Sequence, residues 1–445
     1  MKYVIIGGDA SGMSAAMQIT RGSEDSNEII TLERGQYYSY GQCGLPYVIS
    51  GQVESTEDVI ARPVEVFREK YGIDARIHHN VTEIDEKKQM VKGIETISGK
   101  PFQIEYDKLL IATGVSPVQP DWEGIKLDGI LSMKDIPDTK EILNYIDHHQ
   151  PETVTIAGGG FIGLELAENF KEIGKNVRII QRSNQLMNPI DYDMAELIHK
   201  EAEEKGVELI FEESVQSFSG DHHVNAVVTD QNKYPTDMVL INVGVKPNTE
   251  LVSRADFHLG SKGEMIVNSY METNIPNIYA AGDCASHYNR VKQLNDFVPL
   301  GTTANKQGMI AGMNMVGQHR AFQGIVGTSI LKFLDLDIGR TGLSEKETKQ
   351  LNIPYDTVKV ETNAIAGYYK KGQKITVKIV YEKQSKRLLG GQVIGVKGVD
   401  KRIDVLATAL YHNMTTEQLL NLDLSYAPPY NGVWDPIQQA ARKTL

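Results

Sequence analysis

Cysteine is scarce in this chain, which has two among its 445 residues, Cys43 and Cys284. So few thiols exclude a disulfide framework and the usual four-ligand zinc patterns. The two cysteines lie far apart in the sequence, and neither has a second thiol within a few residues. A local pair of thiols is therefore excluded.

Long apolar runs and an excess of basic residues are also missing. Glycines and charges interrupt every apolar run well before the ~18 residues that a membrane span needs. The opening MKYVIIGG loses its apolar character at Gly7, so we expect no signal peptide, no membrane association and a cytoplasmic protein. A formal net charge of −12 argues against a nucleic-acid partner, and an anionic ligand would need a local basic pocket.

The N-terminal segment KYVIIGGDASGMSAAMQI predicts a strand, a glycine turn and a helix. Gly7 and Gly12 stand at the first and last positions of a G-x-G-x-x-G pattern, with Asp9 in place of the middle glycine. The next strand, EIITLER, ends at Glu33, about 20 residues on, where a carboxylate can accept a hydrogen bond from a ribose hydroxyl. Any strand-turn-helix unit would explain the glycines, but not Glu33.

The same order returns in TVTIAGGGFIGLELAENF, where Gly158, Gly160 and Gly163 fill all three glycine positions. Two such motifs predict two nucleotide cofactors. The strand that follows ends at Gln181 and Arg182, where an NAD site normally has an acid. Loss of the acid and gain of an arginine favour a 2′-phosphate, so we predict that NADPH is used at least as well as NADH. The alternative is a solvated Arg182 and a site that accepts both coenzymes.

Three further segments are typical of a flavin site. YDKLLIATG ends a strand at Thr113 and Gly114, and TNIPNIYAAGDCA ends another at Asp283, whose carboxylate could bind ribityl hydroxyls. PLGTTANKQG, from Pro299, begins a helix whose N-terminus can stabilise negative charge on a reduced ring. From about Gly324 the chain predicts antiparallel strands, an amphipathic helix and no nucleotide motif, which indicates a separate interface domain.

With both glycine motifs, ATG, AAGD and SYGQCGLPY in this order, the chain resembles the pyridine nucleotide-disulfide oxidoreductases over nearly its full length. It is most similar to their single-cysteine branch, and within that branch to the coenzyme A (CoA) disulfide reductases. The resemblance implies an α/β fold with two Rossmann-like domains, for FAD and NAD(P)H, and a C-terminal α+β dimerisation domain. We expect FAD-binding segments at 1–118 and 248–324, an NAD(P)H-binding domain at 119–247 and an interface domain at 325–445.

The resemblance also implies sets of site residues. For FAD they are Gly7, Asp9, Ala10, Gly12, Glu33, Arg34, Gln42, Thr113, Gly114, Asp283, Pro299, Thr302 and Ala304. For NAD(P)H they are Gly158, Gly160, Phe161, Ile162, Gly163, Gln181, Arg182 and Gly244. For the CoA substrate they are Ser14, Gln18, Arg21, Ser39, Gln42, Arg62 and Lys70, of which Lys70 could equally lie on a solvated helix face.

Cys43 is the expected catalytic residue, and by resemblance it lies beside the flavin and rests as a mixed disulfide with CoA. The substrate then supplies the second thiol, which explains a cysteine without a neighbour. Thiol-disulfide exchange needs the thiolate, so we expect a depressed pKa at Cys43, helped by a helix that starts near Leu45. Cys284 is expected to be a small packed residue.

The motifs AGYYKKG and DLSYAPPYNGVWDP carry the closest likeness to CoA disulfide reductases. They imply a homodimer with shared active sites, in which Tyr368 and Tyr426 reach the partner's cysteine. Tyr369 could replace Tyr368, and the alternative role for these tyrosines is core packing.

Three functions stay open for Cys43. The first is CoA disulfide reduction, and the second is reduction of persulfide, peroxide or oxygen. NADH peroxidases and oxidases carry a histidine where this chain has Ala10, which weakens the peroxide and oxygen readings. The third, ranked last, is a redox-sensing flavoprotein.

Histidines occur in three adjacent pairs, His78-His79, His148-His149 and His222-His223. Adjacent side chains diverge in direction, whereas residues four apart on a helix can share an ion. We therefore expect no metal site.

Overall fold

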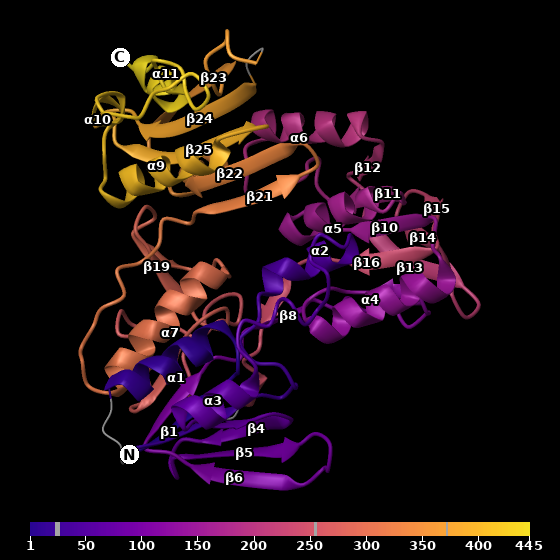
Figure 1. The fold of residues 1–445 in the computed structure, drawn as a ribbon, viewed down its shortest axis with the longest axis vertical. Helices are drawn as coiled ribbons and strands as arrows, with labels where there is room; N and C mark the ends of the chain where they lie inside the picture. Colours follow the sequence, from indigo (N-terminus) through magenta and orange to yellow (C-terminus); the bar gives the residue numbers. More distant parts are fainter. Residues whose placement is uncertain (23–26, 253–255, 371–372) are drawn as a thin grey trace.

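The computed structural model describes residues 1–22, 27–252, 256–370 and 373–445, and three sheets organise them (Figure 1). The predicted α/β class is confirmed: two sheets are parallel and the third, near the C-terminus, is antiparallel. No helix in these four ranges combines the length and the apolar character that crossing a bilayer requires.

The first parallel sheet has the strand order β18-β7-β1-β2-β3. Its strands are β18 (Ile278–Ala280), β7 (Lys108–Ile111), β1 (Lys2–Ile6), β2 (Glu28–Leu32) and β3 (Asp74–Arg76). Four of them are short, mostly apolar runs buried on both faces, as strands covered by helices must be, whereas β3 at the edge has only Ala75 buried. The covering helices are α1 (Ala10–Gly22), α3 (Val64–Tyr71) and α7 (Gly301–Met315), and an antiparallel sheet of β4 (His79–Asp85), β5 (Met90–Glu95) and β6 (Pro101–Glu105) packs nearby.

The second parallel sheet repeats this arrangement in the order β12-β11-β10-β16-β9. Its strands are β12 (Val207–Phe211), β11 (Asn176–Gln181), β10 (Thr153–Ala157), β16 (Met238–Ile241) and β9 (Ile130–Leu131). Around it lie α4 (Ile136–His149), α5 (Phe161–Glu172), α6 (Tyr192–Glu204) and a small antiparallel sheet of β13 (Val215–Gly220), β14 (Val224–Thr229) and β15 (Lys233–Pro235).

Two short strands carry the chain between the parallel sheets. β8 (Val115–Pro117) leads away from the first sheet and β17 (Val245–Pro247) leads back to it. They pair antiparallel, with Val115 opposite Pro247. The Asn248 side chain donates to the Thr113 carbonyl at 2.8 Å, and the Thr113 hydroxyl donates to the Asn248 carbonyl at 2.6 Å. The outgoing and returning segments are therefore fixed to each other.

The third sheet is antiparallel, in the order β21-β22-β25-β24-β23. Its strands are β21 (Ser329–Phe333), β22 (Leu336–Gly342), β25 (Leu388–Gly395), β24 (Lys374–Glu382) and β23 (Tyr355–Asn363). The remaining elements of this region are α8 (Glu345–Gln350), α9 (Val399–Tyr411), α10 (Thr416–Leu420) and α11 (Pro436–Arg442). A helix and antiparallel strands are what the sequence predicted for this part of the chain.

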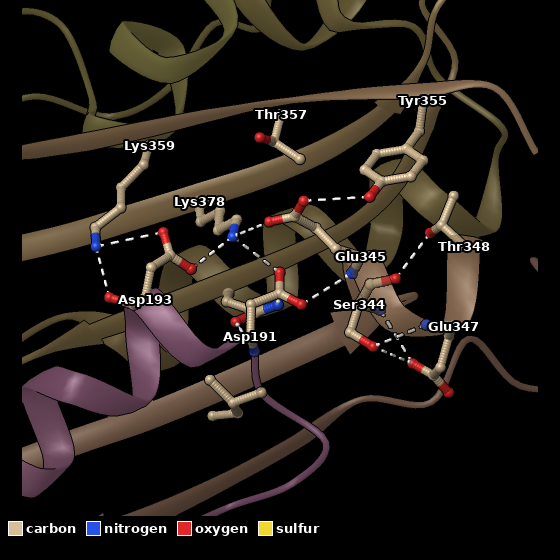
Figure 2. Close-up of polar contacts among 12 residues, drawn as sticks. Asp191, Asp193, Ser344, Glu345, Glu347, Thr348, Tyr355, Thr357, Lys359 and Lys378 are labelled. Atoms are coloured by element: carbon tan, nitrogen blue, oxygen red, sulfur yellow. Dashed lines mark hydrogen bonds and ion pairs between the residues drawn. The ribbon is translucent and has the colours of Figure 1, made fainter. Parts of the chain in front are cut away.

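A buried ion cluster joins α6 to the third sheet. Figure 2 shows the Lys378 ammonium group between three carboxylates, those of Asp191 and Asp193 at the start of α6 and that of Glu345 at the start of α8. The side chain of Lys378 is only 3% exposed, and its nitrogen lies 2.6 Å from Asp193 and 3.1 Å from Asp191. Burial alone would lower the pKa of Lys378, but hydrogen bonds to Asp193 and Glu345 raise it overall. The lysine therefore stays charged and holds the second and third sheets together.

Candidate functional site

A large cavity of about 1990 Å³ opens at the carboxyl ends of the first parallel sheet, where open α/β sheets bind ligands. Residues expected for both nucleotides line it together with Cys43, the expected catalytic residue. They are Gly7, Asp9, Ala10, Glu33, Arg34, Gln42, Cys43, Thr113, Gly114, Gly160, Phe161, Ile162, Gly163, Gly244, Asp283, Pro299, Thr302 and Ala304. Gly12, Gly158, Gln181 and Arg182 lie outside its lining.

The first glycine turn is built for close backbone approach. Gly7 has a φ of +115°, and a Cβ there would lie 2.2 Å from the Ala112 carbonyl oxygen. A Cβ on Gly12 would lie 2.0 Å from the carbonyl oxygen of Gly7. The Glu33 carboxylate accepts hydrogen bonds from the backbone N–H groups of Gly8 at 2.9 Å and Gly35 at 2.8 Å. The acid at the end of β2 therefore lies against the turn, as a ribose-binding acid does.

The second glycine turn has the same form. Gly158 has a φ of +109°, and a Cβ there would lie 2.3 Å from the Asn242 carbonyl oxygen. Gly160, the middle glycine, faces open space and precedes the first residue of α5. Gln181 occupies the position that Glu33 has in the first unit, because its side-chain oxygen accepts from the Gly159 N–H at 3.0 Å. Its amide group donates to Ser183 at 2.6 Å, and Arg182 is exposed.

Both turns therefore fit a dinucleotide. Glycine at each tight position lets a pyrophosphate approach the backbone, and the N-termini of α1 and α5 present N–H donors toward the cavity. A carboxylate follows the first turn and a neutral amide with an arginine follows the second. The carboxylate suits a ribose hydroxyl, and the neutral amide beside an arginine lacks the charge that would repel a 2′-phosphate.

A hydrogen-bonded chain places the Cys43 segment over the first turn. Asp9 accepts from the Tyr40 N–H at 3.1 Å and from the Gln42 side chain at 3.2 Å. Gln42 in turn accepts from the Lys134 ammonium group at 2.8 Å. Sequence reasoning included Asp9 and Gln42 but missed Lys134, which follows β9 and which no motif marks.

Cys43 lies in a single turn of 3-10 helix, Gln42–Gly44, directly before α2 (Leu45–Ile49). Its side chain lines the cavity, and its surface is exposed in the single chain. The expected helix start at Leu45 is present. The expected low pKa is wrong for this chain: although solvent reaches the surface of Cys43, desolvation by the surrounding cavity walls raises the pKa of its thiol, Glu165 and Asp283 raise it further, and Lys134 opposes them. A helix of five residues does not outweigh surrounding carboxylates.

Glu165, on α5, is the second residue that sequence reasoning missed. It lines the cavity beside Cys43, and burial together with the neighbouring Glu168 raises its pKa to about 7. Its position two residues after the second glycine motif gives no signal in one sequence. Because Phe161 and Ile162 of the same helix line the cavity, α5 brings a titratable carboxyl group and nucleotide-turn residues to one place.

Tyr368 and Tyr426 come together although they lie far apart in the sequence. Their hydroxyl oxygens are 3.2 Å apart, and the side chains are 77% and 48% exposed. Such exposure is incompatible with core packing in the single chain. Tyr369 lies instead beside Lys370, whose ammonium group is 5.8 Å from the centre of its ring. Neither Tyr368 nor Tyr426 lines the cavity of its own chain.

The residues expected to bind CoA separate into groups, and only Gln42 of this set lines the cavity. Ser14, Gln18 and Arg21 lie on α1, where the Ser14 hydroxyl donates to Asn305 at 2.8 Å and Arg21 donates to Gln18 at 3.3 Å. The Ser39 carbonyl accepts from the Arg62 N–H at 3.3 Å, which joins their segments.

Lys70 and Cys284 both lie outside the cavity lining. Lys70 lies on α3 over the ring of Tyr71, 5.5 Å from its centre. Cys284 is fully buried, as expected, and its thiol lies 3.5 Å from the Ile111 and Ala281 carbonyl oxygens. It is part of the core below the first sheet.

Residues 1–308 match the pyridine nucleotide-disulphide oxidoreductase family, and residues 328–436 match the dimerisation domain of that family. The chain belongs to the pyridine nucleotide-disulphide oxidoreductases. The likeness inferred from the motifs is thereby confirmed, and so is the enzyme class. The C-terminal match supports a homodimer.

Relatives within the pyridine nucleotide-disulphide oxidoreductases cover nearly the whole chain. The protein is 36% identical over 442 residues to NAD(P)H coenzyme A polysulfide/persulfide reductase of Pyrococcus horikoshii, covering 99% of this chain and 98% of that relative. It is 31% identical over 443 residues to coenzyme A disulfide reductase of Staphylococcus haemolyticus, covering 99% of both.

A solved structure, an engineered water-forming NADPH oxidase made from a Lactobacillus brevis NADH oxidase and bound to NADPH, has a TM-score of 0.95 and 26% identity. It covers 100% of this chain and 98% of its own. Its substitutions include three consecutive ones, Asp to Ala, Ala to Arg and Met to Ser.

Proposed function

We propose that this protein is an FAD-dependent NAD(P)H:CoA disulfide reductase that acts through Cys43. The observation that carries the proposal is the lone Cys43 thiol in a cavity lined by both glycine turns, while Cys284 is sealed in the core. A disulfide reductase with one accessible thiol needs its second sulfur from a substrate. A name among its relatives, coenzyme A disulfide reductase, supplies that substrate class.

The sulfur chemistry balances with one protein thiol. The Cys43 thiolate attacks one sulfur of CoA disulfide, the S–S bond breaks, and one CoA thiolate leaves while a Cys43–CoA mixed disulfide forms. Two electrons then cleave the mixed disulfide, which releases the second CoA thiolate and restores the Cys43 thiolate. The residues around the first glycine turn would hold FAD, and that group would supply the two electrons, which originate as a hydride of NAD(P)H.

Cofactor binding in this proposal uses the residues around the two turns. Gly7, Gly12 and Glu33 hold the FAD nucleotide, and Asp283 with the N-terminus of α7 holds the rest of that cofactor. The NAD(P)H set is Gly158, Gly160, Phe161, Ile162, Gly163, Gln181, Arg182 and Gly244. The remaining FAD set is Asp9, Ala10, Arg34, Gln42, Thr113, Gly114, Pro299, Thr302 and Ala304.

We further propose that NADPH is accepted at least as well as NADH. Gln181, Arg182 and Ser183 present a neutral side chain, an arginine and a serine in the same order as the Ala, Arg and Ser introduced into the engineered NADPH oxidase. Gln181 keeps the hydrogen bond to the glycine turn without the negative charge that would repel a 2′-phosphate.

The homodimer completes the site in this proposal. The raised pKa of Cys43 means that its own chain does not stabilise the thiolate. The hydroxyl pair of Tyr368 and Tyr426, exposed on the dimerisation domain, is suited to donate a hydrogen bond to the partner's Cys43 sulfur or to protonate the departing thiol. CoA phosphates would then lie along Ser14, Gln18, Arg21, Ser39, Arg62 and Lys70, outside the nucleotide cavity.

Polysulfide or persulfide reduction is the second candidate. The observation that favours it is the 36% identity to a CoA polysulfide/persulfide reductase, above the 31% identity to a CoA disulfide reductase. Both reactions use the same Cys43 and the same electron path.

Anaerobic NADPH oxidation tests the proposal, with CoA disulfide and with inorganic polysulfide plus CoA as acceptors. We expect turnover with CoA disulfide, and a loss of about 1000-fold or more in Cys43→Ser while the flavin stays bound. A higher kcat/KM with polysulfide would select the second candidate. Turnover that persists in Cys43→Ser, or that requires oxygen, would reject both.

A further inference from the structure

Three side chains meet on the surface of the region built around the second parallel sheet, far from the nucleotide cavity. They are Asp128 in the loop before β9, His149 at the last position of α4, and His223 in the turn between β13 and β14. The Asp128 Oδ2 atom lies 3.0 Å from Nδ1 of His223 and 3.7 Å from Nε2 of His149. One ligand atom from each residue lies within 4.8 Å of the other two.

The two separations from Asp128 are close to those between ligands of a tetrahedral metal site. Zinc bonds of about 2.0–2.2 Å to nitrogen and carboxylate oxygen place neighbouring ligand atoms roughly 3.3–3.5 Å apart. The two measured separations lie on either side of that value. A cavity of about 290 Å³, lined by both histidines, Glu152 and Asp237, adjoins the cluster and leaves room for a water ligand.

The backbone holds Asp128 and His223 at this distance. The Asp128 N–H donates to the His222 carbonyl at 3.0 Å, and the Val224 N–H donates to the Asp128 carbonyl at 2.9 Å. The Oδ1 atom of Asp128 accepts from the Gly129 N–H at 3.0 Å, which aims the other oxygen, Oδ2, at the histidines. The carboxylate is therefore oriented before any ion arrives.

The His149 ring is held by a separate support. It stacks on Tyr145 with ring centres 4.4 Å apart, and the Tyr145 hydroxyl donates to the Asp237 carbonyl at 2.9 Å. The rings of His149 and His223 are 4.8 Å apart. In metal sites, groups that contact the ligands but not the metal fix the orientation of the histidine rings in this way.

A simple ion pair explains this arrangement less well. One carboxylate oxygen faces both imidazole rings, whose centres are 4.8 Å apart. An ion pair with both rings would need both to be protonated, and two positive charges at that distance repel each other. Exposed ion pairs contribute at most about 1 kcal/mol, so the backbone and ring contacts, rather than the ion pairs, hold the three side chains together. The acidic cluster of Asp191, Asp193 and Glu345 differs, because Lys378 already supplies its positive charge.

We propose that Asp128, His149 and His223 form a binding site for a divalent first-row transition metal, with Zn²⁺ as the ion that best suits two imidazoles, one carboxylate and a water. The ion joins the C-terminal end of α4 to the β13–β14 turn. α4 begins at the cavity and is 14 residues long, so the ion lies about 20 Å from it and stabilises the domain without entering the reaction.

This site departs from the expectation of no metal. The expectation compared the two members of each histidine pair, and they do diverge: the His148 ring bonds the Asn144 carbonyl of its own helix at 2.8 Å. The fold instead brings together one member from each of two pairs, His149 and His223. That juxtaposition depends on tertiary structure, which adjacency in sequence does not reveal.

Zinc titration of the chelator-treated holoenzyme tests the site, with ZnCl₂ and a competing chromophoric chelator. We expect one equivalent of Zn²⁺ to bind at this site and to raise the melting temperature. His149→Gln and His223→Gln should each lower the affinity for this Zn²⁺ ion by at least about 100-fold. Loss of a group that only supports a ligand already lowers metal affinity 10–100-fold. NADPH-dependent turnover should not change in either variant.

The adjacent residues provide matched controls, because His148→Gln and His222→Gln remove a histidine one position away. Both should retain the wild-type affinity for Zn²⁺. Every variant should melt within a few degrees of wild type without metal, which separates lost binding from lost folding. Equal affinity in all four variants, or no tight equivalent in the wild type, would overturn the proposal.

Discussion

At the scale of single residues, the Glu165 carboxylate opposes formation of the Cys43 thiolate. The Glu165 carboxylate raises the pKa of the Cys43 thiol, after burial, and Glu165 itself has a pKa raised to about 7. The negative charge of Glu165, which opposes the Cys43 thiolate, is therefore present above pH 7 and absent well below pH 7. Thiolate formation at Cys43 therefore depends on the protonation of Glu165, on a helix beside the second parallel sheet.

Glu165→Gln should make Cys43 more reactive. With the charge removed, the pKa of Cys43 falls, and a fall of one unit gives about tenfold more thiolate below that pKa. We expect alkylation of reduced holoenzyme by iodoacetamide at pH 8 to accelerate about 3- to 10-fold, and at pH 6 to change little. Glu172→Gln, an exposed carboxyl group on the same helix, is the control. Slower or unchanged alkylation at pH 8 would contradict this effect of Glu165.

Tyr426→Phe tests the shared site. If the hydroxyl protonates the departing CoA thiol, turnover with CoA disulfide should fall about 100-fold while flavin absorbance and dimer mass stay the same. Tyr430→Phe, an exposed tyrosine of the same segment, should retain activity. Full activity in Tyr426→Phe would remove the tyrosine from the reaction.

Arg182→Ala tests the coenzyme preference. Loss of a charged hydrogen bond to a 2′-phosphate should raise the KM for NADPH about tenfold. The KM for NADH should stay within about twofold, so NADH is the internal control. An equal change for both coenzymes would show that Arg182 does not contact the 2′-phosphate.

What a single sequence reveals at this scale is local. Gly7, Gly158 and Glu33 were predictable, because each lies at a fixed spacing within one strand-turn-helix unit. Lys134 and Glu165 were not, because their closeness to Gln42 and Cys43 is created by packing between segments distant in the chain. The error in the expected Cys43 pKa has the same origin.

At the scale of elements, Lys378 on β24 holds α6 against the third sheet. Lys378→Met should lower the free energy of unfolding by about 3–5 kcal/mol, because three carboxylates would lose their buried cation. Lys374→Met on the same strand is the control, since its pair with Glu361 is 3.3 Å long and exposed, and it should cost less than about 1 kcal/mol. Denaturant unfolding followed by fluorescence measures both, and equal losses would contradict the role of the cluster.

Elements with regular patterns were also predictable from the sequence. The segment KRIDVLATALYHNM predicted an amphipathic helix, and α9 (Val399–Tyr411) covers most of it. KITVKIVYE predicted a strand, which is β24. The α6 contact to β24 was not predictable, because Asp191, Asp193 and Lys378 carry no pattern that pairs them across the chain.

At the scale of the whole molecule, the chain crosses from the first parallel sheet to the second and back, then forms the dimerisation domain. This path puts both nucleotide turns and Cys43 on one cavity, and leaves Tyr368 and Tyr426 exposed outside it. In the proposed homodimer, the exposed Tyr368 and Tyr426 of one chain would meet the cavity that contains Cys43 in the other chain.

The central claim is that the second sulfur at Cys43 comes from CoA. Intact mass spectrometry of the unreduced protein tests it most directly, with and without thiol reductant and again for Cys43→Ser. We predict an adduct with the mass of CoA that reductant removes and that the variant lacks. A free thiol, or an oxygen atom added to Cys43, would contradict the claim and indicate peroxide or oxygen chemistry.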